Sequence, residues 1–248
     1  MIKQIIFKKI KFNNVNSKTF NEYVNKNGLF VFPAGPALSN IEKSNEYYKS
    51  LQKADFVFFD SGFFVLLLRL FKNIHVQKFS GYKFLSMFFK YLKKNKKKKI
   101  FCIDPNINFL RSNKKYIKKL GIKKLYNYLA PQYNKKKLED LQLLKTIKTF
   151  KPDYIIVNLA GGTQEILGLY IRKNIRIKAS IFCTGAAISF FTKDQAPINN
   201  FIDRYYLGWL VRLIFNPIIF FKRYLTGLKL IPMVISDKIK ILNIDKIK

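Results

Sequence analysis

Acidic residues, cysteines and histidines are scarce in this sequence. The chain has 248 residues, with 14 Asp and Glu against 47 Lys and Arg. Its two cysteines, Cys102 and Cys183, are too few for a disulfide framework or a cysteine zinc site, so we expect a reducing compartment. His75 is the single histidine. Metal cages built on paired histidines are therefore excluded, and no metal site is predicted.

Long hydrophobic runs are absent as well. No uncharged apolar run reaches the ~18 residues that indicate a membrane-spanning helix. The first residues, Met1–Asn14, lack the apolar stretch and cleavage site of a signal peptide. Zinc-finger spacing and the aromatic signature of RNA-binding domains are also missing, so no nucleic acid partner is predicted. Together these absences favour a cytoplasmic protein.

Aromatic and basic residues are abundant. Hydrophobic residues make up 49% of the chain, with 25 Phe and 14 Tyr, which is ample for a packed core and argues against disorder. The formal net charge of +33 favours contact with anionic lipid or a phosphate-bearing substrate. A lysine-rich solvated surface, as an AT-rich coding sequence would give, explains the excess equally well. A homo-oligomer is compatible with either interpretation.

Short apolar runs alternate with amphipathic segments of helical length. Strands are expected over Leu29–Pro33, Phe56–Phe59, Ile100–Ile103, Lys124–Leu129, Tyr154–Leu159 and Ser180–Cys183. Helices are expected over Glu42–Lys53, Phe63–Phe71, Lys83–Lys93, Asn106–Leu120, Leu138–Thr149 and Gln164–Lys173. Strands separated by helices predict an α/β fold with a Rossmann-like, mostly parallel sheet and helices on both faces. The residues before Glu42 give no further clear pattern, and the first twenty or so form a lead-in without an assigned structure.

The last part of the chain has a different character. Asn199–Phe215 and Ile218–Leu230 are helical in pattern and are divided by Pro217, which cannot continue a helix. Apolar residues with interspersed basic ones fit an interfacial helix pair that associates with a membrane. Packing of these helices on the core is the alternative. We predict a Rossmann-like domain over residues 1–196 and a helical basic and apolar appendage over 197–248.

Polar residues follow the expected strands, where ligands bind in such folds. Asp60 comes directly after Phe56–Phe59, and Ser61 with Gly62 opens the next helix. A carboxylate in this position lies at the mouth of the sheet. It can serve a substrate, or it can cap the helix that follows.

Glycine-rich turns follow two more strands. Gly161 and Gly162 allow backbone N–H groups to approach a ligand closely, and the next helix begins with an N-terminus that favours anions. Gln164 and Glu165 can contact a ligand there, or they can form a capping interaction. Gly185 lies in the turn after Ser180–Cys183, which runs on to the polar residue Gln195.

In this order the segments resemble the WecG/TagA/CpsF glycosyltransferases, also called glycosyltransferase family 26. The resemblance extends from about Phe30 to Leu225. It rests on ADFVFFDSG (Ala54–Gly62), FSGYKFL (Phe79–Leu85), NLAGGTQE (Asn158–Glu165), TGAA (Thr184–Ala187) followed by QAP (Gln195–Pro197), and DRYYLGWLVRLIFNP (Asp203–Pro217) followed by FKRY (Phe221–Tyr224).

The resemblance implies an inverting enzyme that needs no metal or cofactor. Such enzymes transfer an N-acetylmannosamine-type sugar from a UDP-sugar to an undecaprenyl-diphosphate-linked saccharide, as peripheral proteins on the inner face of the cell membrane. Asp60 takes the position of the general base. Substrate-binding positions correspond to Gly35, Ser61, Gly161, Gly162, Gln164, Glu165, Gly185 and Gln195. Basic positions for diphosphate and membrane correspond to Arg204, Arg212, Lys222 and Arg223.

The chain also departs from the family pattern. Pro33 and Gly35 replace a threonine and an asparagine, Thr163 replaces a lysine, and Gly208 replaces a glutamate. A non-catalytic protein that retains the fold and binds a membrane surface or polyanion is therefore the alternative function. An NAD-type oxidoreductase is disfavoured, because no GxGxxG motif follows an N-terminal strand.

Overall fold

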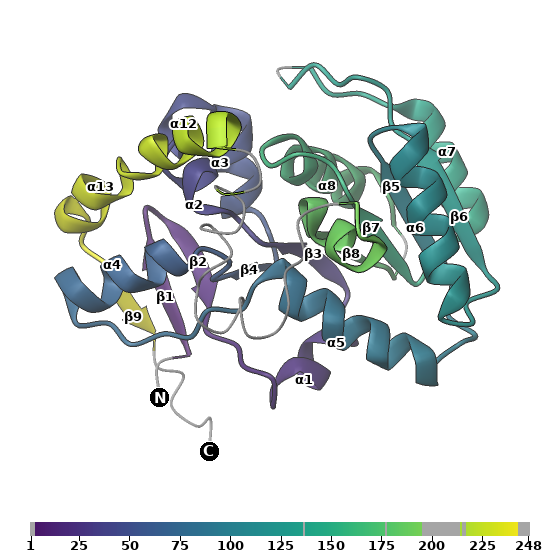
Figure 1. Ribbon diagram of the computed structural model, residues 1–248, viewed down its shortest axis with the longest axis horizontal. Coiled ribbons are helices and arrows are strands. Elements are labelled where there is room, and N and C mark those ends of the chain that lie inside the picture. The colour runs from purple at the N-terminus through teal and green to yellow at the C-terminus, as the bar shows by residue number, and fades with distance from the viewer. Residues whose placement is uncertain (1–2, 136, 177, 195–213, 215–216, 243–248) are drawn as a thin grey trace.

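A computed structural model of the chain describes residues 3–135, 137–176, 178–194, 214 and 217–242. In this described part, nine strands form a single sheet (Figure 1). Their spatial order is β6 (Leu125–Leu129), β5 (Ile100–Asp104), β7 (Tyr154–Val157), β8 (Ser180–Cys183), β3 (Gly28–Val31), β4 (Phe56–Phe58), β2 (Ile10–Asn13), β1 (Gln4–Phe7) and β9 (Lys240–Leu242).

All neighbouring strands from β6 to β2 run parallel, and the pairs of β1 with β2 and with β9 are antiparallel. Strands β3, β5, β7 and β8 are buried along their full length. A strand that is covered on both faces needs no polar side, which is why these segments are continuously apolar. The Rossmann-like α/β fold expected from the alternation of strands and helices is confirmed.

Helices cover both faces of the sheet (Figure 1). One face carries α2 (Gly35–Leu38), the 3-10 turn η1 (Ile41–Lys43), α3 (Asn45–Gln52), α4 (Gly62–Lys72), α7 (Leu141–Phe150), α8 (Thr163–Asn174) and α13 (Leu230–Ser236). The other face carries α1 (Phe20–Val24), α5 (Gly81–Lys94), α6 (Ile107–Lys119), the 3-10 turn η2 (Gly185–Ile188) and α9 (Ser189–Thr192). Each expected helix before residue 174 is present within a few residues of its expected ends.

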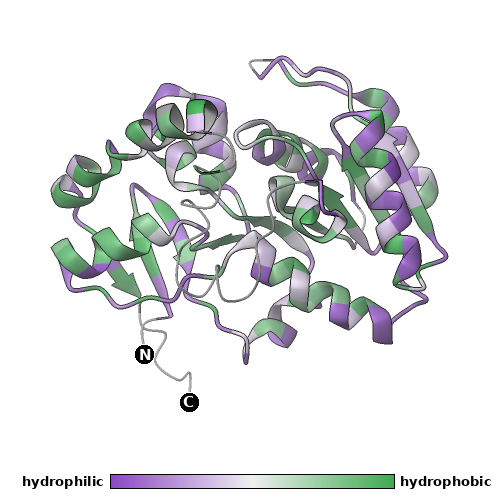
Figure 2. Cartoon of the chain, in the orientation of Figure 1, coloured by the Kyte–Doolittle hydropathy of each residue, from purple (hydrophilic) through white to green (hydrophobic). Residues whose placement is uncertain are grey.

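Successive residues of a strand point to opposite faces of the sheet and pack in two separate hydrophobic cores. Leu29 and Val31 of β3 join the core under α8, whereas Phe30 joins the aromatic core under α5. There, the rings of Phe84 and Phe182 meet edge to face with their centroids 4.7 Å apart. Figure 2 shows hydrophobic strands inside and many hydrophilic residues on α5, α6 and α7, whereas α4 and α13 are largely hydrophobic.

The N-terminal lead-in turns out to be part of the sheet. Strands β1 and β2 form a hairpin whose turn residues, Lys8 and Lys9, have positive φ values of 47° and 58°. Asparagine and glycine are the usual residues at such positions, so the sequence carried no hairpin signal. Tertiary contacts hold the turn instead: Lys8 N–H donates to Asp237 at 2.9 Å, and the Tyr48 hydroxyl donates to the Lys8 carbonyl at 2.8 Å.

The C-terminal segment also reaches the sheet. Helix α12 (Pro217–Gly227) begins at the proline that was expected to divide two helices, and it lies against α2. Helix α13 packs on α4, and β9 then pairs with β1. The expected helix over Asn199–Phe215 lies almost entirely outside the described residues, as does the boundary at 196 and 197, so the domain division stays a prediction. No helix in the described part is long and apolar enough to cross a membrane.

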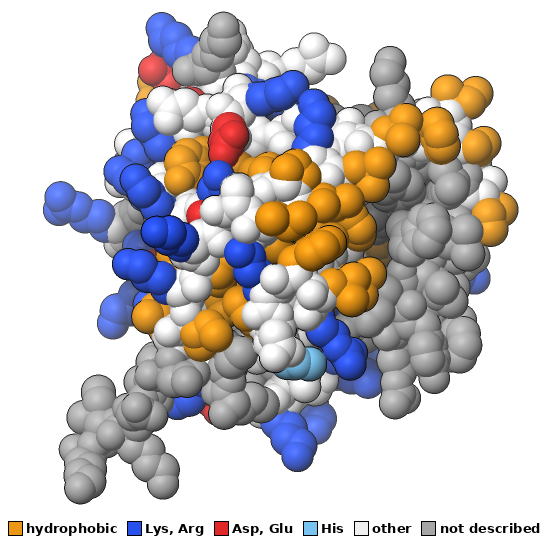
Figure 3. Space-filling model, turned by 90° about the vertical axis from the view of Figure 1, so that its left-hand side faces the viewer, with side chains coloured by type: hydrophobic (Ala, Val, Ile, Leu, Met, Phe, Trp, Pro, Cys, Tyr) orange, Lys and Arg blue, Asp and Glu red, His pale blue; other side chains and the backbone are white. Residues whose placement is uncertain are grey.

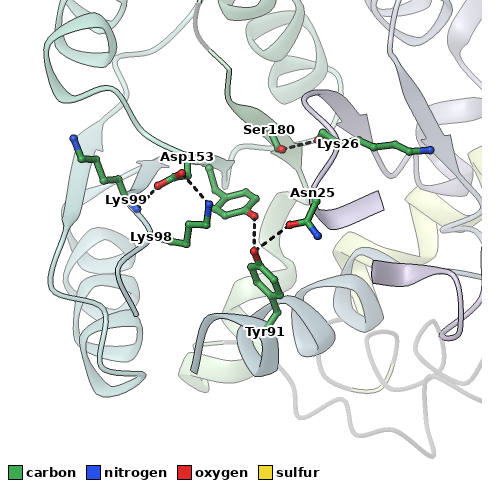
Figure 4. Close-up of polar contacts among 8 residues, drawn as sticks. Asn25, Lys26, Tyr91, Lys98, Lys99, Asp153 and Ser180 are labelled. Atoms are coloured by element: carbon green, nitrogen blue, oxygen red, sulfur yellow. Dashed lines mark hydrogen bonds and ion pairs between the residues drawn. The ribbon is translucent and has the colours of Figure 1, made fainter. Parts of the chain in front are cut away.

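Polar contacts close the amino-terminal edge of the sheet (Figure 4). Asp153, just before β7, accepts hydrogen bonds from Lys98 Nζ at 3.1 Å and from Lys99 N–H at 2.7 Å. The Tyr91 hydroxyl donates to Asn25 Oδ1 at 3.1 Å, and the Ser180 hydroxyl donates to the Lys26 carbonyl at 2.8 Å. These polar groups therefore satisfy one another at the amino-terminal edge.

Close packing of α8 on the sheet gives a stability prediction. A Cβ atom added to Gly168 would lie 2.7 Å from both Cys183 Sγ and Leu29 Cδ1. We expect Gly168→Ala to lower the free energy of unfolding by about 1–3 kcal/mol, because the buried neighbours must shift.

Gly227→Ala is the matched control, since a Cβ atom there meets nothing within 4 Å. Gly168 lies in the middle of α8 and Gly227 is the last residue of α12, so alanine gains at most about 1 kcal/mol of helix propensity at Gly168 and less at Gly227. A lower stability of Gly168→Ala than of Gly227→Ala therefore reports the clash. Urea denaturation measures both free energies, and equal stabilities would contradict the close packing.

Candidate functional site

The carboxyl-terminal edge of the parallel strands gathers the glycine-rich and polar loops. Strands β5 and β7 are neighbours in the sheet. The connection from β5 leads outward to β6 on one side, and the connection from β7 leads to β8 on the other side, so the strand order reverses between β5 and β7. Ligands of open α/β sheets bind outside the carboxyl ends of strands near such a point. The loops after β3, β4, β7 and β8 approach one another along this edge.

Asp60 follows β4 and is held by the N-terminus of α5. Its Oδ1 atom accepts a hydrogen bond from Gly81 N–H at 2.9 Å. Ser61, and not Asp60, is the N-cap of α4, because its hydroxyl accepts a hydrogen bond from Phe64 N–H at 3.2 Å. The carboxylate of Asp60 therefore does not cap α4, the helix that follows it in sequence. It lies half-buried at the mouth of the sheet.

Gly35 brings the loop after β3 against the loop after β4. A Cβ atom added to Gly35 would lie 2.8 Å from Ser61 Oγ and 3.8 Å from Leu230 Cδ1 of α13. Only a residue without a side chain permits this approach. The two expected site residues Gly35 and Ser61 are thus in contact, and the C-terminal segment lies beside them.

A chain of hydrogen bonds joins the glycine-rich loop to the turn after β8. Glu165 Oε2 accepts from Gly162 N–H at 2.6 Å, and Glu165 Oε1 accepts from Gln164 Nε2 at 2.9 Å. Gln164 Oε1 in turn accepts from Gly185 N–H at 2.6 Å. The capping interaction considered for this pair is present at Glu165, while Gln164 fixes the loops after β7 and β8 relative to each other.

The loop between β6 and α7 covers the N-terminus of α8. Gly162 has φ of +89°, and a Cβ atom there would lie 3.4 Å from Lys135 Nζ. The loop that carries Lys135 is fixed at Asp140, whose carboxylate accepts from the hydroxyls of Tyr128 at 2.9 Å and Tyr133 at 2.7 Å. An ammonium group is thereby placed beside a helix N-terminus, where both favour a negative charge.

Burial strongly perturbs the carboxyl group of Glu165. Its side chain is 1% exposed, and loss of solvation raises its pKa from 4.5 to about 7. Hydrogen bonds from Gly162 and Gln164 and the positive charge of Lys135 lower the pKa without cancelling the effect of burial. Glu165 is therefore partly protonated at neutral pH.

Two hydroxyl groups near these acids were not anticipated from the sequence. The Tyr47 hydroxyl of α3 and the Thr184 hydroxyl after β8 are buried and have no hydrogen-bond partner among the residues described. Burial raises the pKa of Tyr47, and the carboxylates of Glu165 and Asp60 raise it further, which places its hydroxyl in the field of both acids. Tyr47 lies in a helix whose pattern indicates ordinary packing, so sequence alone gave no signal.

A second polar cluster lies under α6. Asp104, the last residue of β5, is fully buried, and its carboxylate accepts from Asn113 at 2.7 Å, Asn158 at 2.7 Å and Asn127 at 3.0 Å. Burial raises the pKa of Asp104 despite these hydrogen bonds. The sequence signal is the same as for Asp60, an aspartate at the end of an apolar strand.

Some expected site residues lie outside the described part of the chain, namely Gln195, Arg204 and Arg212. Lys222 and Arg223 belong to α12, but their side chains are outside that part as well. Gly161, by contrast, is exposed at the carboxyl edge beside Ala37 of α2. Within the described ranges, no group of three or more His, Cys, Asp or Glu residues could hold a metal ion.

The fold and this edge define an α/β protein of the Rossmann-like class, with acids and glycine-rich loops at the carboxyl ends of its strands. A family model described as the glycosyl transferase WecG/TagA/CpsF family matches residues 4–243, and the chain belongs to this family. No curated protein matches the sequence. Members of this family transfer a glycosyl group, so the reaction requires a sugar donor and an acceptor.

The shifted pKa of Glu165 predicts a pH dependence of stability. Because the folded-state pKa is raised, from 4.5 to about 7, the contribution is fully present below pH 4.5 and is lost as the pH rises through 7. Glu165→Gln lacks this titration. Its free energy of unfolding relative to the unsubstituted protein should therefore rise by about 3 kcal/mol between pH 4.5 and pH 8.

Urea denaturation at a series of pH values measures this difference. Glu46→Gln on α3 is the control, since Glu46 is exposed and pairs with Lys49 at the surface. The free energy of unfolding of Glu46→Gln relative to the unsubstituted protein should change by less than about 0.5 kcal/mol over the same pH range. A pH-independent difference for Glu165→Gln would show that the buried carboxyl titrates normally.

Proposed function

We propose that the protein is an inverting glycosyltransferase that uses a UDP-sugar donor. It transfers an N-acetylhexosamine of the N-acetylmannosamine type to an undecaprenyl-diphosphate-linked saccharide, in the synthesis of a surface polysaccharide or cell-wall polymer. The observation that carries this proposal is the placement of Asp60 at the carboxyl edge of the sheet, in a chain matched by the family over residues 4–243.

Asp60 is the general base in this proposal. An acceptor hydroxyl attacks the anomeric carbon of the donor, its proton passes to the Asp60 carboxylate, and UDP leaves from the opposite face with the bonding electrons. Gly81 N–H holds one carboxylate oxygen and so sets the direction of the other. A positioned base of this kind contributes roughly 10²–10⁴-fold in rate.

Fixed positive groups stabilise the departing UDP without a metal ion in this mechanism. The Gly161 and Gly162 loop offers the N-terminus of α8, and Lys135 adds an ammonium group beside it. We assign the diphosphate to the basic positions Arg204, Arg212, Lys222 and Arg223 that the family resemblance implies, because arginine binds phosphate in a bidentate manner.

We further propose that the enzyme works on the inner face of the cell membrane. Large apolar side chains are exposed on the helices beside the site, and Figure 3 shows them gathered on one face among Lys and Arg side chains. This apolar patch comprises Leu66, Leu70 and Phe71 of α4, Ile218, Phe221 and Leu225 of α12, and Ile235 of α13. Apolar surface with basic residues around it suits an anionic lipid surface.

Replacement of the base tests the reaction. Asp60→Asn keeps the size of the side chain but cannot accept a proton, so we expect the turnover number to fall by about 10²-fold or more. UDP binding, measured by calorimetry, should change by less than about threefold because the base does not contact the nucleotide in this mechanism. The assay scores acceptor-dependent release of UDP from a panel of UDP-sugars.

Asp153→Asn, at the opposite edge of the sheet, is the control and should retain activity. Unchanged turnover by Asp60→Asn would remove Asp60 from the mechanism. Absence of transfer and of UDP binding in the unsubstituted protein, with vesicle binding retained, would instead favour the non-catalytic membrane-surface protein.

The apolar patch gives a prediction for membrane binding. Leu70 is 66% exposed on α4, and burial of one leucine in lipid is worth about 1.5–3 kcal/mol. We therefore expect Leu70→Asp to weaken binding to phosphatidylglycerol vesicles by about tenfold or more in a sedimentation assay.

Leu141→Asp is the matched control, because Leu141 is 77% exposed on α7 and lies outside the patch. It should bind vesicles like the unsubstituted protein. Equal losses in the two variants, or no loss in either, would contradict a membrane role for this face.

A further inference from the structure

Thr184 carries a buried hydroxyl that the fold does not use. The residue follows β8 and is 7% exposed, and its Oγ1 atom has no hydrogen-bond partner among the described residues. Thr184 is the N-cap of η2, yet its side chain accepts no capping hydrogen bond. A buried hydroxyl without a partner destabilises a protein, so such a group calls for a role outside folding.

Comparable hydroxyls along the same sheet are satisfied. Ser61 and Ser80 accept capping hydrogen bonds at the starts of α4 and α5. Ser180, at the other end of β8, donates to the Lys26 carbonyl. Thr184 is thus the exception at a position where the chain elsewhere pairs its small hydroxyls.

Thr184 itself lies between two segments of the candidate site. On one side lies Gly81, where an added Cβ atom would be 3.5 Å from Thr184 Cβ, and Gly81 N–H binds the Asp60 carboxylate. On the other side lies Gly185, whose N–H binds Gln164. Both neighbours are glycines, so neither offers the Thr184 hydroxyl a side-chain partner.

We propose that the Thr184 hydroxyl binds a hydroxyl group of the sugar that lies beside Asp60. This proposal rests on the proposed function and adds a specificity-determining residue to that site. A threonine hydroxyl both donates and accepts, as a sugar hydroxyl does, and the substrate supplies the partner that the free protein lacks. A site built to hydrogen-bond a substrate hydroxyl discriminates strongly against an analogue without it.

Thr184→Val and Thr184→Ser test the proposal by separating the hydroxyl from the shape of the side chain. Thr184→Val is nearly isosteric and lacks the hydroxyl, and we expect it to lower kcat/KM by about tenfold or more. Thr184→Ser keeps the hydroxyl and should retain activity within about threefold. The melting temperature of Thr184→Val should be equal to or higher than that of the unsubstituted protein, because no hydrogen bond of the fold is lost.

Separate measurements of KM for the UDP-sugar and for the lipid-linked acceptor show which sugar is contacted. An analogue of that sugar lacking the contacted hydroxyl should be used equally well by Thr184→Val and the unsubstituted protein. Thr149→Val is the control, because the Thr149 hydroxyl donates to the Lys145 carbonyl on the exposed side of α7. It should match the unsubstituted protein in both kinetic constants.

Each outcome either supports or overturns the proposed contact between the Thr184 hydroxyl and the sugar. Transfer by the unsubstituted protein with a selective loss in Thr184→Val supports the contact. Transfer by both at rates within about twofold overturns it and leaves the glycosyltransferase function intact, as does a loss explained by a lower melting temperature. Absence of transfer from every donor overturns the proposed function and, with it, the sugar contact at Thr184.

Discussion

Burial of the parallel strands on both faces is the constraint on which this structure depends. Strands β3, β5, β7 and β8 expose no polar side, so helices must cover them above and below. Parallel strands joined by such helices bring all their carboxyl ends to one edge. The polar residues that follow the strands, Asp60 and Gln164 among them, therefore lie together at this edge. The gathering of polar groups at this edge is a consequence of how the core is built.

The same edge carries polar groups that lower stability. Glu165 is buried with its pKa raised to about 7, and the hydroxyls of Tyr47 and Thr184 are buried without partners in the described part of the chain. Elsewhere, at the amino edge, Asp153 and its neighbours satisfy one another. Unfavourable burial concentrated at one edge of a sheet is the arrangement expected where a protein binds a polar ligand, because the ligand supplies the missing partners.

The C-terminal segment links the candidate site to the exposed apolar face. Leu230 of α13 lies beside Gly35, and α13 packs on α4, which carries Leu66 and Leu70 on its outer side. Strand β9 then fastens the segment to β1. A membrane-bound acceptor would therefore meet the apolar patch and the carboxyl edge on neighbouring parts of the molecule, which fits a glycosyltransferase that draws its acceptor from the lipid surface.

Local periodicity determined most of the fold, because a buried strand and an amphipathic helix are each recognisable from a few consecutive residues. The same pattern marks where the strands end, which is why the positions of Asp60 and the Gly161 loop after β4 and β7 could be predicted from sequence, whereas their roles stay predictions. Strands β1, β2 and β9 could not, since their hairpin turn at Lys8 depends on Tyr48 and Asp237, far away in the chain. Tertiary structure likewise decided which side chains and backbone groups contact one another within the candidate site. The contact of Gly81 with Asp60, the position of Lys135 beside Gly162, and the lack of a partner for the Thr184 hydroxyl among the described residues depend on segments brought together by packing. No local pattern encodes a contact between distant segments.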